Sequence, residues 1–166
     1  LTGYSNSGVN ARTIKNNVAL IGSIGGTSGT PRTCLSKRDT TDASVYASGP
    51  SLGYGRGYIW QDGRVNTAMF TTVLAPNSPQ CARANHVEGY YSASSNHSGG
   101  ANALRADGSV MFVSETINTG DLDYAVADGG TASYPSNEAK KEPFGPSPFG
   151  VWGALGSISG GESVAP

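Results

Sequence analysis

The stretch HSGGANALRADGSVMFV, residues 97–113, carries the clearest indication of the fold in this chain. Asp107-Gly108 is a residue pair that tight hairpin turns favour, and residues of alternating character flank it on both sides. We therefore expect an antiparallel hairpin whose tip is a two-residue type I′ turn, with positive φ at both Asp107 and Gly108. His97 precedes the Asp-Gly pair with nine residues between them.

The composition outside this hairpin is that of a turn-rich β protein. Of the 166 residues, 37% are hydrophobic and 24 are glycine, which favours many short strands and few long helices. Only 14% are charged, against about 25% in ordinary soluble domains. A polar but weakly charged surface is typical of extracellular or assembled proteins, so we expect this protein outside the cell or at the cell surface.

The charge pattern excludes one class of partner. The formal net charge is −1, and no run of basic residues is longer than the pair Lys140-Lys141. A nucleic-acid interface would need a basic footprint that this chain lacks. No apolar stretch approaches the roughly 18 residues that a membrane span needs. The chain opens at Leu1, which we expect to be a processed or truncated N-terminus.

The two cysteines, Cys34 and Cys81, stand far apart in the sequence. They form no CxxC pair and have no neighbouring histidine at the spacing of a metal site. We expect them to form one disulfide, which would indicate an oxidising compartment. Two free, buried cysteines are the alternative.

The rest of the chain divides into an arm and one β-rich domain. Residues 1–24 are expected to form an extended N-terminal arm that ends in a strand over residues 18–24. Residues 25–166 are expected to form a single domain, with an insertion at residues 119–146. The β-branched and aromatic residues 70–74 predict a further strand. The fold class is therefore mainly β, or α+β, with short antiparallel strands.

One short helix is predicted near the C-terminus, within residues 147–156. Ser147 fits the N-cap and Pro148 the first helical position. Phe149, Trp152 and Leu155 recur every three residues and give one apolar stripe. Gly156 is suited to end the helix in the left-handed conformation.

These pieces resemble a large family of planctomycete-type secreted proteins, the domain-of-unknown-function 1559 family. The resemblance covers roughly residues 30–164 and includes the H-X9-DG motif, which His97, Asp107 and Gly108 match. The other matching pieces are Arg56-Gly57, residues 60–64, 70–79, 91–95 and 147–156 with Trp152, and Gly160-Gly161-Glu162.

The resemblance implies a pilin-like globular head and no established chemistry. Members of the family have a prepilin-like N-terminus with a long apolar helix, which this sequence does not contain. Three residues depart from the family pattern: Ser98 stands where proline is frequent, Arg105 where an aromatic residue is frequent, and Met111 where a basic residue is frequent.

Few side chains suggest chemistry. His97 and Asp107 could serve acid–base catalysis or bind a metal, but Asp107 is better explained by the turn and His97 by packing at a loop base. We therefore predict no catalytic residue and no cofactor. The weak candidates are calcium at Asp121, Asp123 and Asp128, a metal near Cys81 at His86 and Glu88, and glycosylation at Asn96 of the Asn-X-Ser tripeptide.

The favoured function is structural: a subunit of an extracellular filament, pseudopilus-like fibre or surface layer. An extended arm can add a strand to the open sheet edge of a neighbouring copy, and residues 1–24 are the candidate arm. Deleting them should then abolish assembly and leave the head folded. One alternative is a secreted module that binds a carbohydrate or another protein through exposed aromatic residues. Another is a secreted hydrolase or metalloprotein that uses His97. The aromatic candidates are Tyr4, Tyr54, Tyr58, Trp60, Tyr90 and Tyr91.

Overall fold

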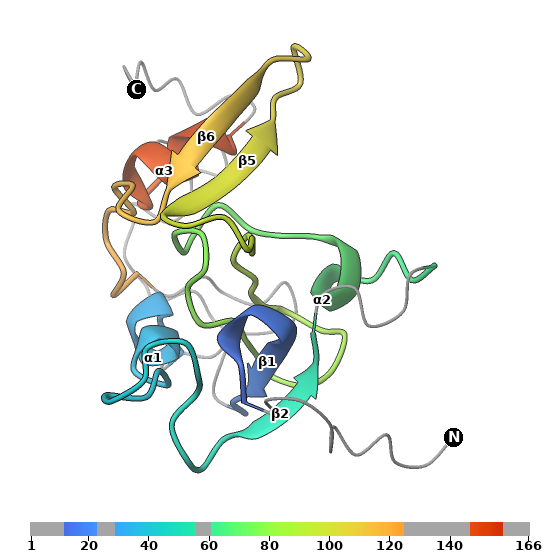
Figure 1. Ribbon diagram of the computed structural model, residues 1–166, viewed down its shortest axis with the longest axis vertical. Helices are drawn as coiled ribbons and strands as arrows, with labels where there is room; N and C mark the ends of the chain where they lie inside the picture. Colours follow the sequence, from blue (N-terminus) through green and yellow to red (C-terminus); the bar gives the residue numbers. More distant parts are fainter. Residues whose placement is uncertain (1–11, 23–28, 56–60, 125–146, 158–166) are drawn as a thin grey trace, which may run out of the picture.

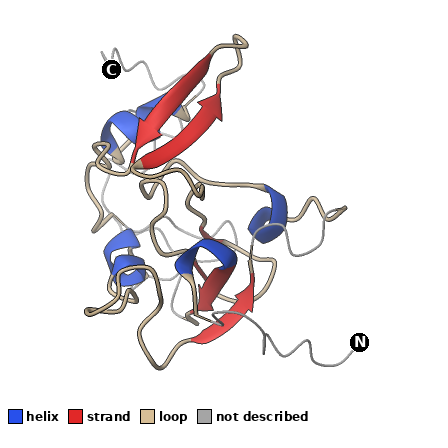
Figure 2. Ribbon diagram, viewed as in Figure 1, coloured by secondary structure: helices blue, strands red, loops and turns tan. Residues whose placement is uncertain are grey.

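The computed structural model of this protein describes residues 12–22, 29–55, 61–124 and 147–157 (Figure 1). The fold class is mainly β with short helices, as the composition predicts, and loops connect most elements (Figure 2). No described helix is long and apolar enough to cross a membrane. The elements in chain order are η1 (Ile14–Asn16), β1 (Asn17–Leu20), α1 (Pro31–Leu35), β2 (Ser51–Tyr54), α2 (Val65–Ala68), β3 (Cys81–Ala82), β4 (Gly89–Tyr90), β5 (Gly100–Leu104), β6 (Val110–Ser114) and α3 (Gly150–Leu155).

The described strands form two separate sheets. A four-stranded sheet has the order β2-β1-β3-β4, and β5 and β6 form a two-stranded hairpin. In the larger sheet β1 pairs antiparallel with β2 and parallel with β3, whereas β3 and β4 are antiparallel. The hairpin lies at the opposite end of the molecule from β1 and β2, and its tip points away from the rest of the chain (Figure 1).

Strand β1 is an interior strand, which changes the interpretation of the predicted arm. Three of its four residues are buried, and it has a neighbour on each side. The predicted strand over residues 18–24 is therefore real but begins at Asn17 and ends at Leu20. The head cannot be expected to fold without residues 1–24, because that deletion removes β1. Residues 1–11 and 23–24 lie outside the described residues.

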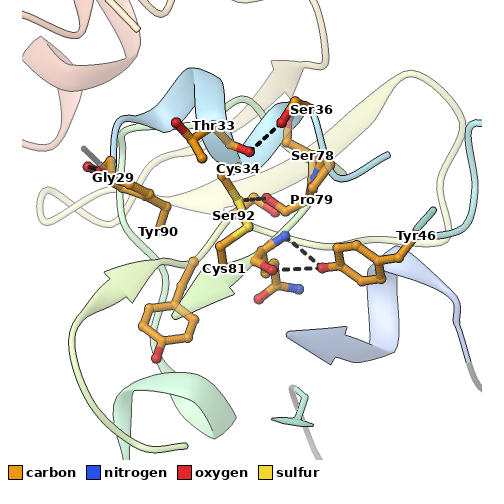
Figure 3. The surroundings of a disulfide bond; sticks show 12 residues. Gly29, Thr33, Cys34, Ser36, Tyr46, Ser78, Pro79, Cys81, Tyr90 and Ser92 are labelled. Carbon is orange, nitrogen blue, oxygen red and sulfur yellow. Dashed lines mark hydrogen bonds between the residues drawn. A yellow bond between two sulfur atoms is a disulfide. The ribbon is translucent and has the colours of Figure 1, made fainter. Parts of the chain in front are cut away.

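The disulfide that the sequence predicts joins Cys34 of α1 to Cys81 of β3 (Figure 3). Its two Cα atoms are 5.7 Å apart, and both residues are fully buried. Helix α1 was not predicted, although its signals are in the sequence: Thr30 caps it by accepting from the Thr33 N–H, and Pro31 occupies the first turn. The bond thus fixes a very short helix to an interior strand.

Tyr46 connects three segments of the core through its hydroxyl group. The oxygen lies 2.8 Å from the Gln80 carbonyl and accepts from the Gln80 N–H at 2.8 Å (Figure 3). It also lies 3.0 Å from the Asn17 carbonyl. The ring packs in a core cluster with buried Ile14, Ala19, Cys34, Leu74, Cys81 and Tyr90.

The strand predicted at residues 70–74 is wrong. This segment lies in no strand, and its contacts explain its apolar composition in another way. The Phe70 ring stacks on the Trp152 indole with centroids 6.1 Å apart, and Trp152 Nε1 donates to the Leu74 carbonyl at 3.0 Å. The segment is therefore apolar because Trp152 packs on Phe70 and because Val73 and Leu74 pack in the core cluster, not because it joins a sheet.

The C-terminal helix α3 is present, but both of its predicted ends differ. The helix begins at Gly150 with Phe149 as its N-cap, and the Ser147 hydroxyl accepts from the Phe149 N–H at 3.2 Å. Gly156 has φ −93°, which is right-handed, so the left-handed C-cap is wrong. The buried Trp152 matches the predicted apolar stripe.

Candidate functional site

The hairpin tip is a three-residue loop, not the predicted two-residue type I′ turn. The Gly108 N–H donates to the Arg105 carbonyl at 3.0 Å, and the Arg105 N–H donates to the Ser109 carbonyl at 2.8 Å. Gly108 alone has positive φ, at 84°, whereas Asp107 does not. This is a type I turn followed by a left-handed glycine, which suits the twist of a hairpin equally well. Gly108 is thus required for the bulge.

Asp107 stabilises this turn with its carboxylate. One oxygen accepts from the Ser109 N–H at 2.8 Å and from the Ser109 hydroxyl at 2.6 Å. The hydroxyl bond first, and then the N–H bond, lower the pKa of Asp107 below its ordinary value. An exposed, ionised carboxylate therefore stands at the tip of the hairpin.

His97 stands at the other end of β5, at the base of the hairpin. Its side chain is exposed, and its backbone N–H donates to the Ser95 hydroxyl at 3.1 Å. The strand between His97 and the tip spans about 15 Å at 3.4 Å per residue, so the two motif residues are too far apart to touch within one molecule. The motif does not form a His–Asp pair inside this chain.

Local geometry explains the Gly99-Gly100 pair at the start of β5. A side chain at Gly100 would overlap the Val113 carbonyl on the paired strand and the ring of Phe112. Gly99 has φ 80°, a conformation that glycine adopts without cost. The start of β5 therefore accepts only glycine, for reasons of local geometry.

The two faces of the hairpin differ in burial. Ala101 and Val113 are cross-strand partners on the inner face, and both are buried. The outer face carries Leu104 paired with Val110, and Phe112, which are 75%, 68% and 53% exposed. These three side chains, which we name the outer patch, form an apolar surface that the described part of the chain leaves uncovered.

The β5 edge of the hairpin is also open at Asn102 and Leu104, which are exposed, whereas Gly100 is buried. Gly99 and Arg105 bond across to β6 and its flanks, so by alternation the main-chain groups of Gly100, Asn102 and Leu104 point away from β6. Within the described residues, none of these outward-pointing groups has a partner in any hydrogen bond. An edge of this kind is a template for another strand.

A shallow cleft of about 320 Å³ lies beside this edge. Its lining includes Ala101 and Asn102, which are on opposite faces of β5, so the cleft follows the strand edge and not one face. Phe70, Ser94, Ser95 and His97 form much of the rest. The Ser95 N–H donates to Asn77 Oδ1 at 2.8 Å, which fixes the loop that forms the cleft floor.

Two of the three predicted calcium residues, Asp121 and Asp123, are described. Asp123 pairs with Arg32 at 2.6 Å, and Asp121 accepts from the Asp123 N–H at 2.9 Å, which are roles in a turn and an ion pair. Asp128 lies outside the described residues. Among the described residues there is no group of three His, Cys, Asp or Glu side chains placed to hold a metal.

The candidate metal residues His86 and Glu88 contact neighbouring side chains. His86 Nδ1 lies 2.7 Å from Asn66 Oδ1, and Glu88 pairs with Arg83. Asn96 is exposed, as a glycosylation site must be. Gly160, Gly161 and Glu162 lie outside the described residues.

Of the aromatic residues proposed to stack on sugars, the two whose side chains the structure describes are not at the surface. Tyr90 and Tyr91 are buried, with exposures of 4% and 2%, and their hydroxyls donate to the Gly29 and Val87 carbonyls. The others fall outside the described part of the chain: Tyr4, Tyr58, Trp60 and the side chain of Tyr54. The exposed aromatic rings instead include Phe70 and Phe112, which the sequence interpretation did not single out. The alternating spacing of Val110 and Phe112 along the predicted strand is the sequence feature that could have indicated the exposed Phe112 ring.

Comparison with known proteins gives one result. A family model described as "Protein of unknown function (DUF1559)" matches residues 10–120, more than half of the chain. No curated protein and no solved structure matches. The matched range contains the disulfide, the four-stranded sheet and the whole hairpin with its H-X9-DG motif. The chain therefore belongs to the DUF1559 family.

Proposed function

We propose that this protein is an extracellular structural subunit that assembles with copies of itself, in a filament, pseudopilus-like fibre or surface layer, through contacts of the β5–β6 hairpin. The observation that supports this most is the combination of an open strand edge with the outer patch on one projecting element. Natural proteins usually protect such edges with charges, prolines or bulges. This hairpin instead carries the exposed apolar side chains of Leu104 and Val110, which favour contact with another molecule.

The disulfide supports an extracellular location. Bonds of this type persist in oxidising compartments and are rare in the cytosol. Cys34 and Cys81 are both fully buried, so the bond is part of the core. A low charged fraction of 14% also reduces the repulsion between copies that come together.

The experiment measures self-association of the full chain by light scattering across a concentration series, with electron microscopy of the same samples. Val110→Lys places a charge in the outer patch and is expected to shift the protein to monomers. Ala84→Lys is the matched control, because it adds the same charge at an exposed position between β3 and β4. If the unmodified chain stays monomeric at millimolar concentration, the proposal is wrong.

The cleft beside β5 favours a second candidate function, a module that binds a neutral saccharide. Part of the Phe70 ring is exposed there, and Ser94, His97 and Asn102 offer hydrogen-bonding groups. Aromatic rings with a few polar groups are common in small-ligand sites. Saturable binding of an oligosaccharide to a monomeric form, abolished by Asn102→Ala, would favour this function over assembly.

A further inference from the structure

We propose that two copies of this chain pair through their β5 edges, antiparallel about a two-fold axis at Asn102, so that His97 of each copy meets Asp107 of the other. The inference rests on the proposed self-assembly and adds its geometry. It gives the H-X9-DG motif a role between molecules, since His97 and Asp107 stand at opposite ends of β5 within one molecule.

Main-chain geometry selects this register. The outward-pointing groups of β5 belong to Gly100, Asn102 and Leu104, with Asn102 in the middle. Pairing about Asn102 places Asn102 opposite its own copy and Gly100 opposite Leu104, so all three residues of each strand have a partner position. Gly100 is buried in the single chain, so its pairs with Leu104 form only when the residues that cover it move aside. Each such pair exchanges two hydrogen bonds, about six in total. A shift of two residues in either direction leaves one of the three without a strand partner.

The same axis brings the two motif residues to one place. Asn102 lies midway between His97 and Asp107 in the sequence. In an antiparallel pair centred on Asn102, a residue five positions before the centre lies beside the one five positions after it in the other copy. The base of each hairpin, with His97, therefore lies against the tip of the other, with Asp107.

The charges at the two ends are complementary in this arrangement. The tip carries the ionised Asp107 carboxylate and the exposed Arg105. The base carries His97 and the exposed Glu115, whose N–H donates to the Gly99 carbonyl. Antiparallel pairing puts Asp107 near an imidazole donor and Arg105 on the side of Glu115. A parallel arrangement would place tip against tip and base against base, with like charges together.

The shape of the surface agrees with the same pairing. Leu104 of one copy lies opposite Gly100 of the other, next to the Phe112 ring that packs over Gly100. The cleft along the β5 edge, next to His97, provides space for the approaching tip. Because the two-fold axis is perpendicular to the plane of the hairpin, the outer patches of both copies lie on one face of a four-stranded sheet. This enlarges the apolar surface available for further assembly.

The register is tested by cysteine cross-linking of the full chain. The native cysteines are joined in a buried disulfide, so an added cysteine is the only free thiol. Asn102→Cys would lie about 5.5 Å, Cα to Cα, from its own copy, which a disulfide spans. Leu104→Cys is the control, because its two copies would be about 14 Å apart. Mild oxidation should give a covalent dimer of Asn102→Cys and none of Leu104→Cys.

The outcomes separate this inference from the proposed function. If the protein assembles but Asn102→Cys gives no covalent dimer, or Leu104→Cys gives one, the register is wrong and assembly stands. If the unmodified chain does not self-associate at all, both fail.

A charge cycle tests the motif contact by sedimentation equilibrium. His97→Asp places two carboxylates together and should weaken dimerisation at least tenfold. Because His97 and Asp107 are both exposed, substitutions at these positions should leave the fold unaffected. Asp107→Asn keeps an oxygen for the Ser109 bonds. It should weaken dimerisation of the unmodified chain but strengthen that of the His97→Asp variant. If the two substitutions have independent effects, His97 and Asp107 do not meet.

Discussion

The four-stranded sheet, whose strands have two or four residues, and the β5–β6 hairpin, whose strands have five, are stabilised in different ways. The sheet contains a buried disulfide and a tyrosine hydroxyl that bonds two other segments, and its strand β1 has neighbours on both sides. The hairpin has one buried face, an apolar outer face and an open β5 edge. A two-stranded hairpin is at most marginally stable in water by itself. The sheet holds the fold together, and the hairpin is available for contact with another molecule.

The disulfide gives the most severe test of this comparison. Replacing Cys34 and Cys81 by alanine should lower the free energy of unfolding by about 4 kcal/mol, because the unfolded chain regains the freedom of a long loop. Urea unfolding followed by circular dichroism measures the loss. The double variant should also be insensitive to reductant, unlike the unmodified chain. A loss below about 1 kcal/mol would mean that the sheet does not depend on this bond.

Tyr46→Phe tests the polar contacts in the core of the sheet. The substitution keeps the ring but leaves the buried Gln80 N–H without the acceptor at 2.8 Å. We expect a loss of about 1–3 kcal/mol in the free energy of unfolding, measured by urea titration. Tyr91→Phe is the matched control, because the Tyr91 hydroxyl donates to one carbonyl only, in a part-buried position. We expect this variant to lose less free energy of unfolding than Tyr46→Phe. An equal loss in both variants would contradict a special role for Tyr46.

The same tyrosines predict how stability depends on alkaline pH. Burial raises the pKa of Tyr46 above its ordinary 10.0, and burial together with Glu88 raises the pKa of Tyr91 to about 12. The folded protein then holds these protons more tightly than the unfolded chain. Stability should be unchanged by these groups below pH 10 and should fall as the pH rises above it, by up to about 1.4 kcal/mol per unit and group.

The control for this pH dependence is the Tyr46→Phe variant. Its stability should fall less steeply above pH 10 than that of the unmodified chain, as followed by urea unfolding at a series of pH values. An equal slope would show that Tyr46 does not contribute.

The smallest effect on stability is expected at the outer patch. Leu104→Ser changes a side chain that is 75% exposed, so the free energy of unfolding should change by less than about 0.5 kcal/mol. Val113→Ala, on the buried face of the same hairpin, should cost about 2 kcal/mol. Thermal unfolding of the two variants measures the difference. Similar losses would mean that the two faces are not as different as their burial implies.

The sequence predicts those features that depend on short patterns. The hairpin over residues 97–113 follows from its alternation and its Asp-Gly pair, the disulfide from the isolation of Cys34 and Cys81, and α3 from its apolar stripe. The details of the tip were wrong because a type I turn with a left-handed Gly108 uses the same residues as a type I′ turn. Local sequence does not separate these two solutions.

The errors in the predicted structure arise where the conformation of a segment depends on residues far from it in the sequence. Residues 70–74 have strand composition, but an indole from near the end of the chain occupies the Leu74 carbonyl. The interior position of β1 depends on its pairing with β2 and β3, which its own sequence does not encode. The candidate site was missed for a related reason: an open edge becomes visible only once all other strands have been placed.

The bond from Trp152 to Leu74 has a consequence for synthesis. Its partners are 78 residues apart, and the tryptophan belongs to the last described helix. A nascent polypeptide must emerge from the ribosome beyond Trp152 before the indole can stack on the Phe70 ring. Until then it exposes an aromatic ring and an unsatisfied carbonyl. Translation products that stop before α3 should therefore be more susceptible to proteases than chains that include it.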